Sequence, residues 1–231
     1  MVNQFIITID GTSSTGKSTI AKRIAKKIGY VYIDSGAMYR ALTYYSIQKN
    51  IISKSFFKKD LLINALPSIK INFIKNPISK NLEVNLNGNF IEDKIRSLLV
   101  SDFVSELAKL EDVRSYMVKI QHSLGNKKGI VMDGRDIGTV VFPNAEYKFY
   151  LDASSKLRAK RRYDELIKEN KEITFNEVFE NICSRDEIDI NRSNSPLKKA
   201  SDAILIDTEN LNLDQVENKI LKYLNFSNLN T

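Results

Sequence analysis

Eight consecutive residues near the N-terminus have the composition of a phosphate-binding loop. They fit the pattern G-x-x-x-x-G-K-[ST] and read Gly11-Thr12-Ser13-Ser14-Thr15-Gly16-Lys17-Ser18. In such a loop, backbone N–H groups surround phosphate oxygens, the lysine reaches the β- and γ-phosphates, and the last hydroxyl can ligate Mg²⁺. A Ser/Thr-rich loop with a chance lysine is the alternative, and it is disfavoured because a strand pattern precedes the run and a helical pattern follows it. The sequence therefore predicts a nucleotide phosphate site.

Arginines form the second group of candidate residues. An enzyme that joins two phosphorylated substrates must hold two polyanions in contact, and arginine does this with a bidentate, permanently charged side chain. Taken singly, each arginine could equally be a solvated surface residue, so only their positions are informative. Eight stand near the ends of expected elements or in loops: Arg40, Arg114, Arg135, Arg158, Arg161, Arg162, Arg185 and Arg192.

Asp133 ends an apolar strand pattern and has two interpretations. It could cap the turn that follows, or it could hold Mg²⁺ through water, as a carboxylate of phosphate-loop enzymes does. The residues around it leave both open. The guanine motif N-K-x-D is not found, since Asn126-Lys127-Lys128-Gly129 fails at its last position, and neither is the D-x-x-G switch of GTPases.

Strand and helix patterns alternate in the segments that must position these residues. An apolar run at 5–9, a helical pattern over 17–28 and a strand at 30–33 predict a βαβ unit with parallel strands. Further buried strands are expected at 129–132, 147–151 and 203–206, and helices at 104–122, 155–170, from 174 onward and at 213–224. The predicted fold class is α/β, with a central parallel sheet flanked by helices.

The middle of the chain has a different pattern. Residues 69–73 and 82–86 alternate apolar with polar side chains, as half-exposed antiparallel strands do, and Asn87-Gly88 is a hairpin signal before 89–91. We therefore expect a small antiparallel sheet inserted at one edge of the main domain.

Composition limits the remaining choices. The chain has 231 residues, 42% of them hydrophobic and 27% charged, which fits one large globular domain or one domain with an insertion. A net charge of +7 suits an anionic partner of any kind. A single cysteine and a single histidine exclude a disulfide framework, a cysteine-based zinc site and a multi-histidine metal site. No membrane-span or signal-peptide pattern is found, so we expect a soluble cytoplasmic protein.

Five further sequence blocks carry a recognisable pattern: Ile9-Asp10-Gly11, Asp34-Ser35-Gly36-Ala37-Met38-Tyr39-Arg40-Ala41, the segment from Asp133 to Pro143, Leu151-Asp152-Ala153-Ser154-Ser155, and the segment from Arg185 to Arg192. Together they resemble the bacterial-type cytidylate kinases, and the resemblance runs from about Ile6 to Leu224. The D-S-G-x-x-Y-R and D-G-R-D-x-G-T blocks are specific to that family. Thr12 stands where the family loop usually has proline, and Ser14 where it usually has glycine.

The resemblance implies a role for each matching position. Arg40 and Arg135 are expected on the phosphate of CMP, and Ser105, Arg114 and Asp136 on cytosine. The implied ATP-binding residues are Gly11, Thr12, Ser13, Ser14, Thr15, Gly16, Lys17, Ser18 and Thr19, with Arg158 and Arg162 of a basic lid helix. The implied substrate-binding residues are Ser35, Arg40, Ser105, Arg114, Arg135, Asp136, Arg185, Asp189 and Arg192; the catalytic ones are Lys17, Arg135, Arg185 and Arg192; and the candidate Mg²⁺ ligands are Ser18 and Asp133.

The resemblance also implies an activity and an architecture. The activity is transfer of the γ-phosphoryl group of MgATP to CMP or dCMP in pyrimidine nucleotide metabolism, by a monomer with neither nucleic acid nor membrane as partner. The architecture is a three-layer P-loop kinase core at 1–61 and 103–231, a helical lid at about 155–195, and an inserted nucleoside-monophosphate-binding subdomain at 62–102. The alternatives are a P-loop kinase for another small acceptor and a regulatory nucleotide-binding protein that uses its basic face on RNA.

Overall fold

The computed structural model describes residues 4–168 and 172–224, so residues 1–3, 169–171 and 225–231 of the predicted core and lid lie outside the described residues. Contacts divide the chain into two compact units. The sheet unit comprises Met1–Ile33 and Leu124–Thr231, and the helical unit comprises Asp34–Ser123. Among the described helices, none is long and apolar enough to cross a membrane.

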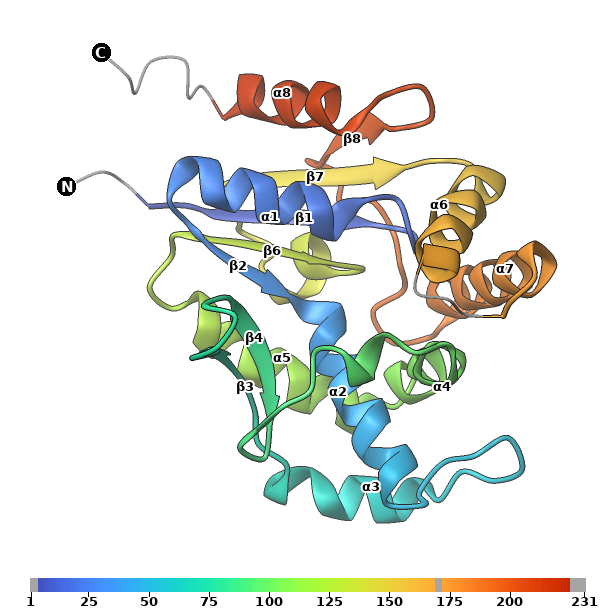
Figure 1. The fold of residues 1–231 in the computed structure, drawn as a ribbon. Helices are drawn as coiled ribbons and strands as arrows, with labels where there is room; N and C mark the ends of the chain where they lie inside the picture. The colour runs from blue at the N-terminus through green and yellow to red at the C-terminus, as the bar shows by residue number, and fades with distance from the viewer. Residues whose placement is uncertain (1–3, 169–171, 225–231) are drawn as a thin grey trace. The chain divides into compact units, whose positions relative to one another are not determined.

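The sheet unit is built on five parallel strands in the order β2-β6-β1-β7-β8 (Figure 1). The central strand β1 pairs with both β6 and β7, and its residues are almost entirely buried, as expected for a strand covered on both faces. The parallel sheet predicted from the apolar runs is confirmed. The strands are β1 (Ile6–Gly11), β2 (Val31–Asp34), β6 (Ile130–Gly134), β7 (Tyr147–Asp152) and β8 (Ile204–Asp207).

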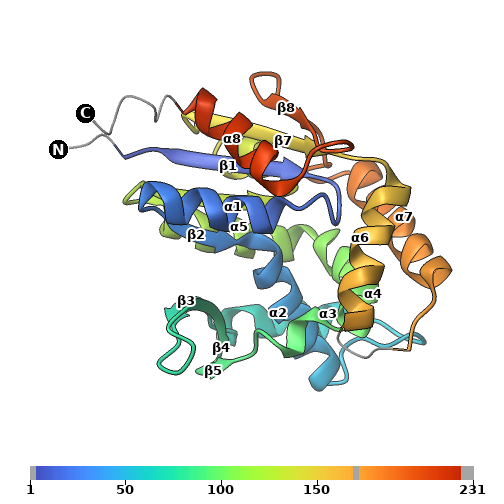
Figure 2. The ribbon, with the colours of Figure 1, turned by 45° about the horizontal axis from the view of Figure 1, so that its top comes forward.

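Helices follow most of these strands, and their ends have recognisable caps. The first helix, α1, has its C-cap at Gly29, whose positive φ of 72° suits glycine. Thr174 and Glu177 form the capping box that the sequence predicts at the start of α7. The helical pair α6 and α7, the predicted lid, pack against each other in both ribbon views (Figure 2). The helices are α1 (Lys17–Ile28), α6 (Ser155–Lys168), α7 (Phe175–Asn191) and α8 (Leu213–Tyr223).

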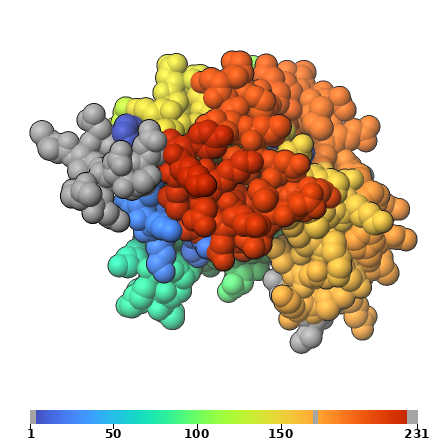
Figure 3. Space-filling model, turned by 90° about the horizontal axis from the view of Figure 1, so that it is seen from above, coloured from blue at the N-terminus to red at the C-terminus, as the bar shows by residue number. Residues whose placement is uncertain are grey.

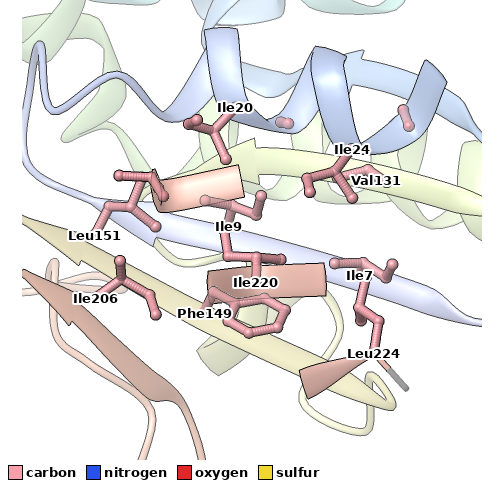
Figure 4. Packing of buried hydrophobic residues seen from close by; sticks show 13 residues of the cluster. Ile7, Ile9, Ile20, Ile24, Val131, Phe149, Leu151, Ile206, Ile220 and Leu224 are labelled. Atoms are coloured by element: carbon pink, nitrogen blue, oxygen red, sulfur yellow. The ribbon is translucent and has the colours of Figure 1, made fainter. Parts of the chain in front are cut away.

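One face of the sheet carries a hydrophobic core cluster of this unit. Ile7 and Ile9 of β1 are fully buried and pack with α1 and α8, as Figure 4 shows for Ile20, Ile24 and Ile220. Seen from above, α8 forms an outer surface of the molecule, red in Figure 3. Because side chains alternate along a strand, Thr8, which lies between these two isoleucines, faces the other side of the sheet. On that side a single π-helical turn, η3 (Ile137–Val141), packs against β1 and β6.

The helical unit contains the predicted antiparallel sheet, in the order β3-β4-β5. Asn87 and Gly88 join its last two strands with φ values of 49° and 89°, which are the left-handed conformations of a tight hairpin turn. The sheet lies within 62–102, and the role of that segment as a separate insertion stays a prediction. Its strands are β3 (Ile71–Lys75), β4 (Leu82–Leu86) and β5 (Asn89–Phe90), with helices α2 (Ser35–Gln48), α3 (Lys59–Ala65) and α4 (Leu98–Ala108) and short 3-10 turns η1 (Leu66–Ser68) and η2 (Lys94–Arg96).

The prediction of a single helix over 104–122 is wrong, because the chain forms two helices there. α4 ends at Ala108, and α5 (Glu111–Gly125) begins after a tight turn in which the Leu110 N–H donates to the Leu107 carbonyl at 3.1 Å. Glu111 and Asp112 favour a new helix start, since acidic side chains stabilise the first turn. An apolar periodicity that continues through the turn hides this break in the sequence.

Candidate active site

The phosphate loop leaves β1 at Gly11, where only glycine fits. Its φ is 148°, and a Cβ atom there would lie 2.1 Å from the carbonyl oxygen of Leu151. Gly16 enters α1 with a φ of 89°. Ser14, which replaces the usual glycine of the family loop, also has a positive φ of 59°, a conformation that costs an L-residue about 1 kcal/mol. The loop therefore keeps a left-handed backbone at Ser14 even though that position has a side chain.

Lys17 is folded back onto this loop. Its side chain is buried, and its ammonium group donates to the Thr12 carbonyl and, at 3.2 Å, to the Thr15 hydroxyl. Burial lowers the pKa of Lys17 well below its usual value of 10.5, and the neighbouring charge of Arg135 acts in the same direction. Burial therefore makes the charged form of Lys17 unfavourable, and an anion bound in the loop would stabilise that charge.

Ser18 and Asp133 bring two oxygen atoms together beside the start of α1. The Ser18 hydroxyl donates to Oδ2 of Asp133 at 2.8 Å, and the Tyr32 hydroxyl donates to Oδ1 at 2.9 Å. No group of three or more His, Cys, Asp or Glu side chains that could hold a metal is found within the described residues. Mg²⁺ is usually bound by one or two protein carboxylates together with substrate phosphates, so a hydroxyl and a carboxylate fit this ion.

Four of the predicted substrate-binding residues lie together in the sheet unit. Asp189 bridges two arginines: its Oδ2 is 3.0 Å from Nε of Arg135, and its Oδ1 is 3.6 Å from Nη1 of Arg192. Nη2 of Arg192 is 3.6 Å from Oδ1 of Asp136. Burial opposes the charge of Arg135, but Asp189 and Asp186 outweigh it and raise the pKa of Arg135 above its usual value. Asp189 lies on α7, and Arg185 is half-buried on the same helix.

Asp10 fixes the backbone next to this cluster. It is the last carboxylate of β1, and its two oxygens accept the N–H groups of Ile137 at 2.9 Å and Gly138 at 2.7 Å. These bonds attach the start of η3, and with it the preceding Asp136, to the central strand. Burial raises the pKa of Asp10 to about 7, even though the two N–H groups favour the ionised form.

Replacing Asp10 with asparagine is expected to change how stability depends on pH. The pKa of Asp10 is 3.8 when exposed and about 7 in the fold, so the folded state binds the proton more tightly. Stability from this group is therefore lost as pH rises from 3.8 to about 7. Relative to Asp10→Asn, the wild type should lose up to about 1.4 kcal/mol of unfolding free energy per pH unit in that window. Urea denaturation at a series of pH values measures this, and parallel profiles for the two proteins would contradict it.

The three arginines of α6 have different partners. Arg158 is buried and donates to the carbonyls of Ala153 and Ser13, both at 2.9 Å. Arg161 donates to the Thr208 carbonyl at 2.9 Å and is 3.4 Å from that of Thr15. Arg162 pairs with Glu165 at 3.1 Å on the half-exposed side of the helix. Arg158 and Arg161 thus bind the phosphate-loop backbone, and the ATP contacts implied for Arg158 and Arg162 stay predictions.

Asp34 organises the predicted phosphate-binding arginine of the helical unit. Its Oδ1 accepts the Ala37 N–H at 2.8 Å and caps α2. Its Oδ2 is 2.8 Å from Nη2 of Arg40 and 3.6 Å from Nη2 of Arg96. Burial alone would raise the pKa of Asp34, but the two arginines lower it below its usual value. The carboxylate therefore stays ionised and keeps Arg40 in place.

The other predicted residues of the helical unit are buried on its helices. Ser35 is the first residue of α2, and Ser105 lies on α4. Arg114 of α5 is 4% exposed, and its guanidinium carbon lies 5.8 Å from the centre of the Tyr39 ring. This distance allows a cation–π contact, which would fix the arginine against α2.

Several residues that support these candidates escaped the sequence analysis. Asp10, Asp34 and Asp186 lie inside the quoted sequence blocks but have no assigned role there, while Arg96 and Tyr32 lie outside them. The one available signal was position: Asp10 and Asp34 each follow an apolar strand pattern, where parallel strands bring polar groups to one edge of a sheet.

Known proteins resemble the chain along nearly its whole length. A model of the family "Cytidylate kinase" matches residues 7–226. A cytidylate kinase of Flavobacterium psychrophilum is 47% identical over 224 residues, which cover 97% of this chain and 99% of that protein. A cytidylate kinase of Bacteroides fragilis is 50% identical over 212 residues, which cover 92% of this chain and 93% of that protein. The resemblance found in the sequence blocks is thereby confirmed, and the chain belongs to the cytidylate kinase family.

Proposed function

We propose that the protein transfers the γ-phosphoryl group of ATP to CMP or dCMP, giving ADP and CDP or dCDP. The match of residues 7–226 to the cytidylate kinase model carries the proposal. The phosphate loop and the cluster of Arg135, Asp136, Asp189 and Arg192 support it. Phosphoryl transfer between two nucleotides needs a donor site and a separate set of cations for the acceptor. A cytoplasmic location, a monomeric state and the absence of nucleic-acid and membrane partners belong to the proposal.

The chemical step needs little from the protein besides positioning and charge. The nucleophile is a phosphate oxygen of CMP, which is already anionic at neutral pH, so no strong general base is required. Lys17 can exchange its bonds to Thr12 and Thr15 for bonds to phosphate oxygens of ATP. A buried ammonium group gains most from such an exchange, because water screens it least.

We assign Mg²⁺ to the two oxygens of Ser18 and Asp133. When bound there, Mg²⁺ would neutralise charge on the β- and γ-phosphates. Tyr32 donates to the other oxygen of Asp133 at 2.9 Å and would hold the carboxylate in one orientation. Supporting residues of this kind fix metal ligands in many proteins.

Different residues are assigned to the phosphate, the sugar and the base of the acceptor, according to the chemistry of each part. Arg40 and Arg135 are assigned to the phosphate, while Arg185, Asp189 and Arg192 are assigned to the sugar and phosphate. Ser105, Arg114 and Asp136 are assigned to cytosine, whose N4 amine is a donor and whose N3 and O2 are acceptors. In this assignment the segment 62–102 contributes the nucleoside-monophosphate-binding part, and Arg185 and Arg192 join Lys17 and Arg135 as catalytic groups.

A coupled assay of ADP release across several acceptors tests the function. CMP, dCMP, UMP and shikimate are supplied in turn at fixed ATP and Mg²⁺. The highest kcat/KM is expected for CMP or dCMP. A higher value for shikimate or UMP would identify a P-loop kinase for another acceptor. ADP release at one rate with every acceptor would indicate hydrolysis and would overturn the proposal.

Replacing Asp136 is expected to change the choice of base. An ionised carboxylate accepts the N4 amine of cytosine but repels O4 of uracil. Asp136→Ala should lower kcat/KM for CMP by roughly two decades and narrow the gap between CMP and UMP. Asp136→Asn should partly restore UMP, because an amide can donate to O4. If kcat/KM measurements give an unchanged CMP-to-UMP ratio in both variants, cytosine is bound elsewhere, with Ser105 and Arg114 the next candidates.

A further inference from the structure

Two side chains of the helical pair hold both polar groups of one phosphate-loop residue. The Ser13 N–H donates to Oδ1 of Asp186 on α7 at 3.2 Å, and the Ser13 carbonyl accepts from Nη1 of Arg158 on α6 at 2.9 Å. The same Nη1 is 2.6 Å from Oδ2 of Asp186. Ser13, Arg158 and Asp186 therefore form a closed ring of interactions, which we call the Ser13 clamp.

The Ser13 clamp is buried and each of its charges is paired. The Arg158 and Asp186 side chains are 6% and 11% exposed. A buried ion pair is favourable only when further hydrogen bonds satisfy its remaining polar atoms. Here the Nε of Arg158 donates to the Ala153 carbonyl at 2.9 Å, and Asp186 accepts from Ser13. The position of Asp186 is thus tied to the conformation of the loop.

Asp186 is also tied to the predicted acceptor side. It precedes Asp189 by one helical turn, and residues three apart lie on the same face of a helix. Asp189 pairs with Arg135 at 3.0 Å. Asp186 and Asp189 both act on Arg135 and raise its pKa. One turn of α7 therefore links Ser13 of the phosphate loop to Arg135 at the end of β6.

We propose that Asp186 is a positioning residue through which ATP in the phosphate loop raises the affinity for CMP. An incoming polyphosphate adds negative charge beside the Asp186 carboxylate and competes for the N–H groups of the loop. In this proposal, a shift of the α7 turn that carries both Asp186 and Asp189 weakens the ion pair between Asp189 and Arg135 and so frees Arg135 for the phosphate of CMP. The identity of the two ligands rests on the proposed function. Coupling of this kind is reciprocal, so CMP must raise the affinity for ATP by the same factor.

Calorimetry of CMP binding, with and without a non-hydrolysable ATP analogue and Mg²⁺, tests this proposal. In the wild type the analogue should tighten CMP binding at least about fivefold. Asp186→Asn keeps an oxygen for Ser13 but loses the charge that pairs with Arg158, so the ratio of the two affinities should fall toward one. Glu187→Gln, an exposed neighbour on the same helix, removes the same charge outside the clamp and should keep the wild-type ratio.

Steady-state kinetics separates coupling from a merely structural role. In Asp186→Asn, the KM for CMP at saturating ATP should rise at least about fivefold, by loss of the same coupling factor, with a smaller change in kcat. If Asp186→Asn does not fold, Arg158→Lys is the substitute, because lysine keeps the charge but cannot hold Ala153, Ser13 and Asp186 together. A wild-type ratio of one, or an unchanged ratio in the clamp variant, would overturn the coupling. A wild type that makes no CDP would instead overturn the proposed function.

Discussion

Replacing Lys17 with alanine is expected to lower CMP phosphorylation by about two to four decades, the effect typical of removing one electrostatic contact from a transition state. Lys17 is a buried cation directly in the phosphate loop, and its ammonium group is held by the loop itself. The loss should appear in kcat, because the charge on the transferring phosphoryl group then lacks its nearest mobile cation. Steady-state assay of CDP formation at saturating ATP and CMP measures it.

A matched control separates chemistry from folding in this experiment. Lys22→Ala removes the same side chain from the exposed face of α1 and should leave turnover unchanged. Circular dichroism and the urea midpoint should show that Lys17→Ala is folded, since the variant removes a buried charge rather than an apolar core residue. Turnover close to wild type in a folded Lys17→Ala protein would exclude Lys17 as a catalytic group.

Replacing Arg135 with alanine should impair the use of CMP much more than the binding of ATP. A charge-assisted hydrogen bond contributes about 1.5–3 kcal/mol, so kcat/KM for CMP should fall by roughly one to two decades. Arg40→Ala should act in the same direction, because Arg40 is the other arginine assigned to the acceptor phosphate. Titration calorimetry with each nucleotide separates the two effects. Equal weakening of ATP and CMP would contradict the assignment of these arginines to the acceptor.

When Arg135 is removed, its ion-pair partner Asp189 still has a second arginine nearby. Asp189 would lose its partner at 3.0 Å but would keep Arg192 at 3.6 Å, so the carboxylate is not left without a cation. We therefore expect the Arg135→Ala protein to fold. Asp34 has a similar arrangement, because Arg96 remains near it when Arg40 is removed.

Local patterns predicted the elements of the fold because each pattern reports on its own segment. The apolar runs gave the parallel strands, Asn87-Gly88 gave the hairpin, and Thr174 with Glu177 gave a helix start. The break between α4 and α5 was missed because a short turn interrupts the backbone hydrogen bonds without interrupting the apolar periodicity. The residues of the phosphate loop are consecutive, so one local pattern named them together, and their binding of phosphate stays a prediction.

The contacts that position the candidate site could not be predicted in the same way. Asp10 and Gly138 are 128 residues apart in the chain, Arg135 and Asp189 are 54 apart, and Ser13 and Asp186 are 173 apart. No local periodicity relates such residues. The family resemblance assigned roles to Ser13, Arg135 and Asp189, but none to Asp10 or Asp186. The pairing of all these residues depends on the order of the strands and on how α6 and α7 return to the phosphate loop.

Transfer of a labelled γ-phosphoryl group tests the central claim most directly. The protein is incubated with γ-labelled ATP, Mg²⁺ and CMP, and the nucleotides are separated by chromatography. We predict that the label appears in the β-phosphate of CDP, in one-to-one proportion with the ADP formed. Label found in inorganic phosphate, with no labelled CDP, would contradict the assignment of this protein as an ATP-dependent kinase of CMP.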